Sequence, residues 1–354
     1  MDIKYLEKLT NANGISGYER EIAKIMEDKL RPTNNNIYYD NIGSLIVHKE
    51  GTGPKVMLAA HLDEVGFLVK DIDDNGFIKF IPVGGWWNQV LLGQKVCING
   101  QNKKIYGVIG SKPPHVLSME QRKQPVEIKD MFIDVGVYSK KEVLELGINI
   151  GDMITPVGDL SIMNNEDFIM AKALDNRIGC YIVTKIMERL ADQTLNIDLY
   201  GVATVQEEIG LRGAKTSSNL INPDIAIAID TGIAGDTPGM TRDDSMSKLG
   251  EGLQMIVMDR TTFGHVNLRK KLEEIAKEKN IKYQLDFTPG GGTDAGEMHL
   301  THDGALGISL SVATRYIHSH LSIINKKDVD NLIDLMVEFC KYLNEEKYQE
   351  IKKG

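Results

Sequence analysis

Two adjacent glutamates follow an apolar run near the middle of this 354-residue chain. Residues 199–205 are mostly apolar or β-branched, and Gln206, Glu207 and Glu208 come directly after them. Such a run predicts a buried strand, at whose end two carboxylates are costly unless a cation compensates them. Arg212 is the only basic residue close by. A metal site explains this pair, and a solvated turn with two surface glutamates is the alternative.

Other histidines and carboxylates occupy similar places, at the end of an apolar run, just beyond one, or at the start of an expected helix: His61, Asp63, Asp175, Asp230 and His318. Sites in open α/β sheets form at the carboxyl ends of the strands. We therefore expect these side chains to meet at one edge of a sheet. Imidazole and carboxylate ligands without thiolates suit a catalytic site for divalent Zn, Co or Mn.

The number of ligands favours two metal ions. One ion would take His61 and Asp230, the other would take Glu208 and His318, and Asp175 would bridge them. A single carboxylate can bridge two ions that lie about 3.5–4 Å apart. Asp175 has a simpler alternative role as the N-cap of the helix expected over 176–190.

This arrangement leaves Glu207 and Asp63 without a metal. An unligated carboxylate beside an activated water is what a general base requires, so we assign that role to Glu207. Asp63 lies two residues after His61, and we expect it to accept the second imidazole N–H and to fix the orientation of the ring. A simple turn aspartate is the alternative for Asp63.

The pattern of apolar runs and glycine turns indicates an inserted domain. Residues 65 to about 162 show short alternating runs separated by glycine turns, which is typical of a small β-barrel. Strands alternate with helices on both sides of this block, which predicts an α/β fold with a mostly parallel sheet covered by helices on both faces. We divide the chain into a catalytic part (1–64), an inserted β-barrel domain (65–165) and a second catalytic part (166–354). Ser16 and Glu19 predict a capping box at a helix start.

Composition excludes several classes of protein. A net charge of −9 argues against a nucleic-acid partner. The sequence has no apolar run long enough to span a membrane, and its first residues lack the apolar core of a signal peptide. Three scattered cysteines without CxxC spacing fit a reducing cytoplasm.

Five segments, AAHLDEVGF, ALDNRIG, VQEEIGLRGA, AIDTGIAGDTPG and RYIHS, occur in this order. Together they resemble the cytosolic tetrahedral-type aminopeptidases, co-catalytic metallopeptidases that include glutamyl and deblocking aminopeptidases. The resemblance implies metal ligation by five residues and base catalysis by a sixth: His61, Asp175, Glu208, Asp230 and His318, with Glu207. It also implies short peptides as substrates and a homo-oligomer, commonly a dodecamer built from dimers, with the barrel as the natural dimer contact.

Residues 289–295 resemble the substrate-pocket loop of the same family, which makes Gly291, Thr293 and Asp294 candidate substrate contacts; a flexible turn is the alternative. Trp86 and Trp87 belong either to the barrel core or to an oligomer contact. We expect His115 to cap a loop rather than to reach a neighbouring subunit.

Three rival functions stay open. Some relatives are labelled endoglucanase, and a glycoside hydrolase would use Glu207 with a second carboxylate. That function leaves both histidines and Asp175 without a purpose. The others are a non-catalytic metal-binding assembly protein and a dinuclear amidase or deacylase.

Overall fold

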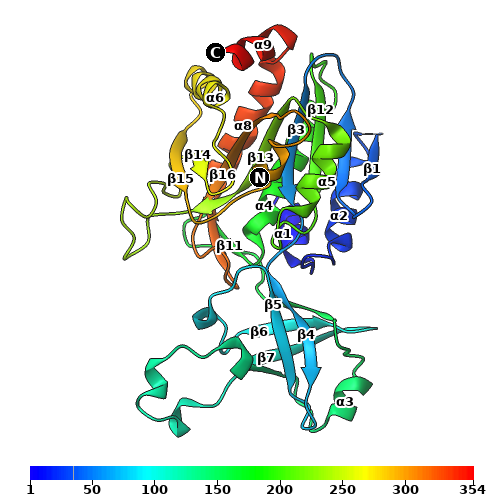
Figure 1. Cartoon of the computed structure of the whole chain (residues 1–354), viewed down its shortest axis with the longest axis vertical. Helices are drawn as coiled ribbons and strands as arrows, with labels where there is room; N and C mark the ends of the chain where they lie inside the picture. The colour runs from blue at the N-terminus through cyan, green and yellow to red at the C-terminus, as the bar shows by residue number, and fades with distance from the viewer. Residues whose placement is uncertain (35) are drawn as a thin grey trace.

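The computed structural model describes residues 1–34 and 36–354. Within these residues the central element is a mixed, eight-stranded sheet with helices on both faces (Figure 1). In spatial order its strands are β1 (Ile37–Tyr39), β2 (Leu45–Lys49), β12 (Asp198–Thr204), β3 (Lys55–His61), β13 (Ile225–Ile233), β16 (Leu306–Thr314), β14 (Leu253–Asp259) and β15 (Tyr283–Thr288). The block from β12 to β16 is parallel, and β2 and β14 flank it antiparallel. The predicted α/β class is confirmed.

Side chains of β3 alternate between two apolar layers, as the pleat of a strand requires. Val56 and Leu58 belong to the larger core, whereas Met57 and Ala59 belong to the smaller core on the opposite face. The larger core contains residues of α1 (Ile3–Asn11), α2 (Arg20–Leu30), α4 (Leu174–Leu190), α6 (Val266–Glu278), α8 (Lys326–Tyr342) and α9 (Glu345–Lys353). The smaller core contains residues of α5 (Arg212–Ile221) and α7 (Ala295–Met298). Burial on both faces explains why the central strands read as continuous apolar runs.

The predicted barrel is present as a closed body with its own core, below the sheet in Figure 1. Around the barrel its strands are β4 (Gly66–Ile72), β5 (Ile78–Val83), β8 (Phe132–Asp134), β7 (Lys104–Gly110), β6 (Lys95–Asn99) and β9 (Met153–Pro156). All of them lie inside the proposed insertion, 65–165. Ser139 caps the short helix α3 (Lys140–Glu145).

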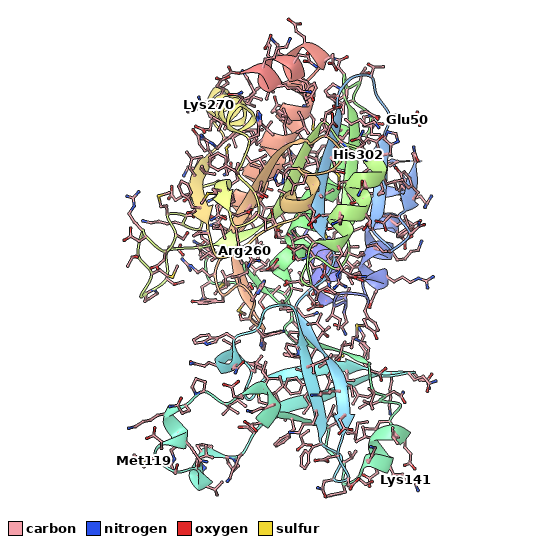
Figure 2. The ribbon with its side chains drawn as sticks, in the orientation of Figure 1. Glu50, Met119, Lys141, Arg260, Lys270 and His302 are labelled. Atoms are coloured by element: carbon pink, nitrogen blue, oxygen red, sulfur yellow. The ribbon has the colours of Figure 1, made fainter. Side chains whose placement is uncertain are left out.

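A small antiparallel sheet joins the end of the insertion to the rest of the chain. It contains β10 (Ser161–Ile162), β11 (Phe168–Ala171) and β17 (Ser322–Asn325). A long segment, 111–130, projects from the barrel and carries η2 (Pro114–Val116), η3 (Gln121–Lys123) and η4 (Ile128–Asp130). Met119, which is 73% exposed, lies at its far end (Figure 2). No helix within residues 1–34 and 36–354 is long and apolar enough to cross a membrane.

The capping box expected at Ser16 is wrong. Asp2 caps α1, and Glu19 stands at the N-cap of α2 without a side-chain cap. The hydroxyl of Ser16 instead donates to Asp63 at 2.6 Å, and Glu19 accepts from the backbone N–H of Gln206 at 2.9 Å. Because these bonds reach the segments around the candidate site, tertiary contacts have replaced the local cap.

Candidate metal centre and active site

Asp175 lies between the two histidines. Its Oδ1 is 3.2 Å from Nε2 of His61, and its Oδ2 is 3.2 Å from Nε2 of His318. Asp230 Oδ1 lies 3.7 Å from the first imidazole, and Glu208 Oε1 lies 3.4 Å from the second. The structure thus brings all five expected ligands into one cluster. Its residues form three groups close enough to hold an ion: His61, Asp175 and Asp230; Asp175, Glu208 and His318; and His61, Glu207 and Glu208.

The parallel strands explain the convergence. His61 is the last residue of β3 and pairs with Thr204, the last residue of β12. Asp230 lies inside β13 rather than at its end, because that strand continues to Ile233. Asp175 belongs to the first turn of α4, where its own dihedral angles are not helical. The cluster therefore forms at one edge of the sheet, where the sequence places it.

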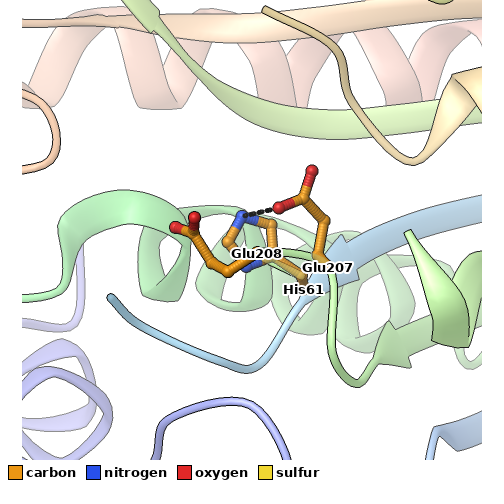
Figure 3. A group of neighbouring side chains, drawn as sticks. All are labelled: His61, Glu207 and Glu208. Atoms are coloured by element: carbon orange, nitrogen blue, oxygen red, sulfur yellow. Dashed lines mark ion pairs between the residues drawn. The ribbon is translucent and has the colours of Figure 1, made fainter. Parts of the chain in front are cut away.

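Glu207 lies beside this cluster. Its Oε2 is 3.9 Å from Nε2 of His61, and Figure 3 shows the two side chains facing each other with Glu208 on the other side of the ring. Gln206 has a φ of 57°, in the left-handed region. That sharp bend lets both glutamates of one turn reach the cluster.

The carboxylate of Asp63 holds that turn. It is fully buried and accepts hydrogen bonds from the backbone N–H of Glu207 and of Glu208, each at 3.1 Å. Nδ1 of His61 lies 3.0 Å from the backbone oxygen of Asp63 and 3.5 Å from its carboxylate. The nearer acceptor for the imidazole is therefore the carbonyl, and the carboxylate mainly positions the glutamates.

In the cluster, the negative charges of the carboxylates outnumber the positive charges that the two histidines can carry. Burial raises the pKa of Glu207 well above its usual value, against the attraction of His61. Burial also raises the pKa of Asp230 strongly and that of Glu208 to about 7. Burial favours a neutral His318, yet the hydrogen bond to Asp175 and the charge of Glu208 raise its pKa to about 9. Protons thus compensate a surplus of buried negative charge, which is what divalent cations would do. The donor set fits such ions.

Two glycines of the barrel touch the cluster. A Cβ built on Gly84 would lie 3.0 Å from Oε2 of Glu208, and one on Gly85 would lie 3.0 Å from Nδ1 of His318. The turn after β5 therefore packs directly on two candidate ligands. Sequence reasoning missed this contact, because no local pattern tells which barrel turn faces the sheet.

A buried charge network beneath the cluster was also missed. Arg177 is fully buried and donates to the backbone oxygens of Leu9, Ala12, Gly14 and Leu62. Glu64 accepts from this arginine and, at 2.6 and 2.8 Å, from the buried Lys172. The network ties the end of α1 to the segment after His61. Glu64 lies more than 100 residues before Lys172 and Arg177 in the sequence, so only the fold reveals their pairing.

Two of the three substrate candidates line a cavity of about 740 Å³ that opens at the cluster. Gly291 and Thr293 line it, as do Arg260 and Phe287. Asp294 is buried, and its carboxylate accepts from the hydroxyl of Thr204 at 2.5 Å. Burial raises the pKa of Asp294 to about 6. Asp294 therefore stands behind the cavity wall.

The two neighbouring tryptophans differ in burial and packing. Trp86 stacks on Phe67 with ring centroids 4.8 Å apart, and its Nε1 donates to the carbonyl of Gly66, so it packs on the barrel core. Trp87 is 62% exposed. His115 lies in η2 on the projecting segment, also exposed.

Comparison with known proteins identifies the class. The family model described as M42 glutamyl aminopeptidase matches residues 43–335, which makes the protein a peptidase. Glutamyl aminopeptidase of Lactococcus lactis is 35% identical over 98% of this chain and 98% of its own length. The chain belongs to the M42 family of aminopeptidases. The resemblance noted in the sequence is thereby confirmed.

Solved structures agree with this assignment. A TET aminopeptidase from Thaumarchaeota archaeon SCGC AB-539-E09 superposes with a TM-score of 0.97, at 38% identity, over 99% of this chain and 98% of that one. TET1 peptidase of Pyrococcus horikoshii, which can assemble into a tetrahedron or a large octahedral shell, gives 0.87 at 32% identity over 96% and 99%. A Thermotoga maritima protein named endoglucanase gives 0.78 at 28% identity over 98% and 99%.

Proposed function

We propose that this chain is a metal-dependent aminopeptidase that removes the N-terminal residue of short peptides with two divalent ions. One observation supports it above the others: Asp175 turns one oxygen to each histidine, and Glu207 stands beside the first of them. We assign His61 and Asp230 to one ion, Glu208 and His318 to the other, and Asp175 to both. Zn is the first candidate, with Co and Mn as alternatives, because the donors are imidazoles and carboxylates.

Bound divalent ions would activate a water and polarise the carbonyl of the scissile bond. Glu207 then takes the proton of the attacking water and delivers it to the leaving amine. A carboxylate can perform both halves of this transfer, first as a base and then as an acid. Asp63 holds Glu207 and Glu208 in register through their backbone N–H groups. Gly291 and Thr293 contact the N-terminal residue of the substrate from the cavity wall.

We further propose a homo-oligomer in the cytoplasm, with a dodecamer built from dimers as its form. The TET1 relatives, one a dodecamer and one a tetrahedron or octahedral shell, support a large assembly. All three cysteines, Cys97, Cys180 and Cys340, are free and buried, which suits a reducing compartment. We assign the dimer contact to the barrel, residues 65–165.

The rival glycoside hydrolase is supported by the names of structural relatives, one from Thermotoga maritima called an endoglucanase and another called a putative peptidase/endoglucanase. Cleavage of a glycosidic bond by two carboxylates gives no role to the histidines of the candidate metal centre. A non-catalytic assembly protein would need no carboxylate placed like that of Glu207, and an amidase or deacylase would accept substrates without a free amine.

The deciding assay compares aminoacyl p-nitroanilides, their N-acetylated forms and a soluble polysaccharide, with metal-loaded and chelated protein. We expect p-nitroaniline to be released only from the substrates with a free amine, and we expect chelation to abolish this activity. Turnover of N-acetylated substrates would favour the deacylase. Polysaccharide cleavage that survives chelation would favour the glycoside hydrolase, and no turnover of any substrate would favour the assembly protein.

A further inference from the structure

A second cavity, of about 820 Å³, lies between the barrel and the loop that follows β16. Trp86, Trp87 and Val90 line it from the barrel side, and Tyr316, His318 and His320 line it from the other side. The short helix η1 (Asn88–Val90) belongs to the barrel end that faces the helix-covered sheet (Figure 1). The cavity is thus a cleft between the two parts of the chain.

The two cavities adjoin each other at the candidate metal centre. Gly85, Ile317 and His318 line both of them. His318 therefore forms the boundary, with the cluster and Gly291 on one side and the tryptophans on the other. A peptide whose first residue fills the first cavity, and whose scissile bond lies at the cluster, must continue past this boundary.

The walls of the second cavity are firmly supported. Tyr316 and His318 have φ values of 60° and 54°, a strained left-handed backbone that only surrounding contacts maintain. The carbonyl of Tyr316 accepts from the hydroxyls of Ser319 and Ser322, at 2.7 and 3.1 Å. Arg315, the residue before, makes two hydrogen bonds to Asp236, at 2.8 and 2.7 Å.

These supports present aromatic surface to the cleft. Tyr316 is 56% exposed and Trp87 is 62% exposed, although both belong to segments that are anchored by neighbours. None of the described residues that line this cavity is Asp, Glu, Lys or Arg. Rigid aromatic walls that carry no Asp, Glu, Lys or Arg side chain favour apolar or aromatic side chains and the faces of peptide groups over charged ones.

We propose that this cleft binds the leaving part of the substrate, the residues that follow the scissile bond, and that Trp87 and Tyr316 select apolar or aromatic side chains there. The inference rests on the proposed aminopeptidase function. It adds a specificity site on the far side of His318, in which barrel residues contact the peptide.

The test uses the full-length, metal-loaded chain and one N-terminal residue, Xaa, chosen as the best cleaved. Substrates are Xaa-amide, Xaa-Ala and Xaa-Phe. We expect the wild type to prefer Xaa-Phe over Xaa-Ala in kcat/KM by about fivefold to tenfold, the range of one aromatic contact. Trp87→Ala and, independently, Tyr316→Ala bring this ratio close to one. Tyr138→Ala, which removes a 90% exposed tyrosine outside both cavities, keeps the wild-type ratio.

Three results would overturn the inference. A wild type that does not distinguish Xaa-Phe from Xaa-Ala has no such selection. An unchanged ratio in both variants would place the leaving peptide elsewhere. A change of oligomer size in Trp87→Ala would assign the cleft to a second copy of the chain. If the wild type cleaves none of the substrates, the amide included, the aminopeptidase function itself fails, which is a different outcome from intact cleavage without selection.

Discussion

Gly85 and His318 are in such close contact that a methyl group on the glycine would lie 3.0 Å from the imidazole Nδ1. The glycine belongs to the inserted barrel, and the histidine belongs to the loop after β16. The barrel therefore contributes to the shape of the candidate metal centre without supplying a ligand.

Gly85→Ala should displace His318 and weaken the ion held with Glu208. Contacts around a metal ligand typically change metal affinity by about 10–100-fold, and we expect a loss in this range for one of two ions. Equilibrium dialysis against a metal buffer measures it. Gly290→Ala is the matched control, because its Cβ would meet nothing within 4 Å. Equal metal binding by both variants would show that the contact does not matter.

Glu207→Gln should retain both ions and lose turnover. The amide cannot take the proton of the attacking water, and general base catalysis contributes about 10²–10⁴-fold to rates. Metal content and kcat measured on the same sample separate the two effects. Glu251→Gln is the control, because it changes an exposed glutamate outside the cluster, and it should keep the wild-type kcat. Wild-type turnover by Glu207→Gln would assign the base elsewhere.

Arg177→Met should destabilise the fold strongly. The change removes a buried donor from four backbone oxygens and takes away one of the two charge partners of Glu64. Breaking a buried ion pair on one side costs about 3–5 kcal/mol, so the denaturation midpoint should fall markedly. Arg189→Met, in the same helix α4, removes a surface pair with Asp334 and should cost at most about 1 kcal/mol. Similar midpoints for the two variants would refute the role of the network.

Asp328, in the first turn of α8, predicts a pH dependence of stability. Burial raises its pKa to about 6, against hydrogen bonds from the N–H groups of Gly250 and Gly252. In an unfolded chain the pKa is about 3.9, so the folded chain binds this proton more tightly. The resulting stabilisation is complete below about pH 4 and is lost as the pH rises through about 6.

Asp328→Asn has no proton to lose at this position. Compared with wild type, the variant should therefore gain relative stability between about pH 4.5 and pH 7.5. Thermal unfolding of both proteins measures the difference in Tm at each of the two pH values. Both proteins are kept free of metal, so that the candidate site contributes no ligand effect. A difference in Tm that does not change with pH would contradict the assignment.

Local sequence patterns predict much of the fold. Continuous apolar runs predict the buried strands β3, β12, β13 and β16, because burial on both faces leaves no polar positions. The ends of these runs also identify His61 and Glu208, since parallel strands deliver their last residues to one edge. Alternating runs with glycine turns predict the barrel.

What could not be predicted depends on contacts between distant segments. Ser16 forms a convincing local cap pattern, yet Asp63 captures its hydroxyl. The contact of Gly85 with His318 depends on how the barrel is oriented toward the sheet, and no periodicity encodes that. Arg177 reads as an ordinary helix residue until the carbonyls that it binds are in place.

Anomalous diffraction from crystals of the zinc-loaded protein tests the dinuclear centre most directly. We predict two peaks per chain, one among His61, Asp175 and Asp230, the other among Asp175, Glu208 and His318, and neither peak in Asp175→Ala. One peak only, or two peaks that persist without the Asp175 carboxylate, would contradict the shared-ligand centre on which the proposed chemistry depends.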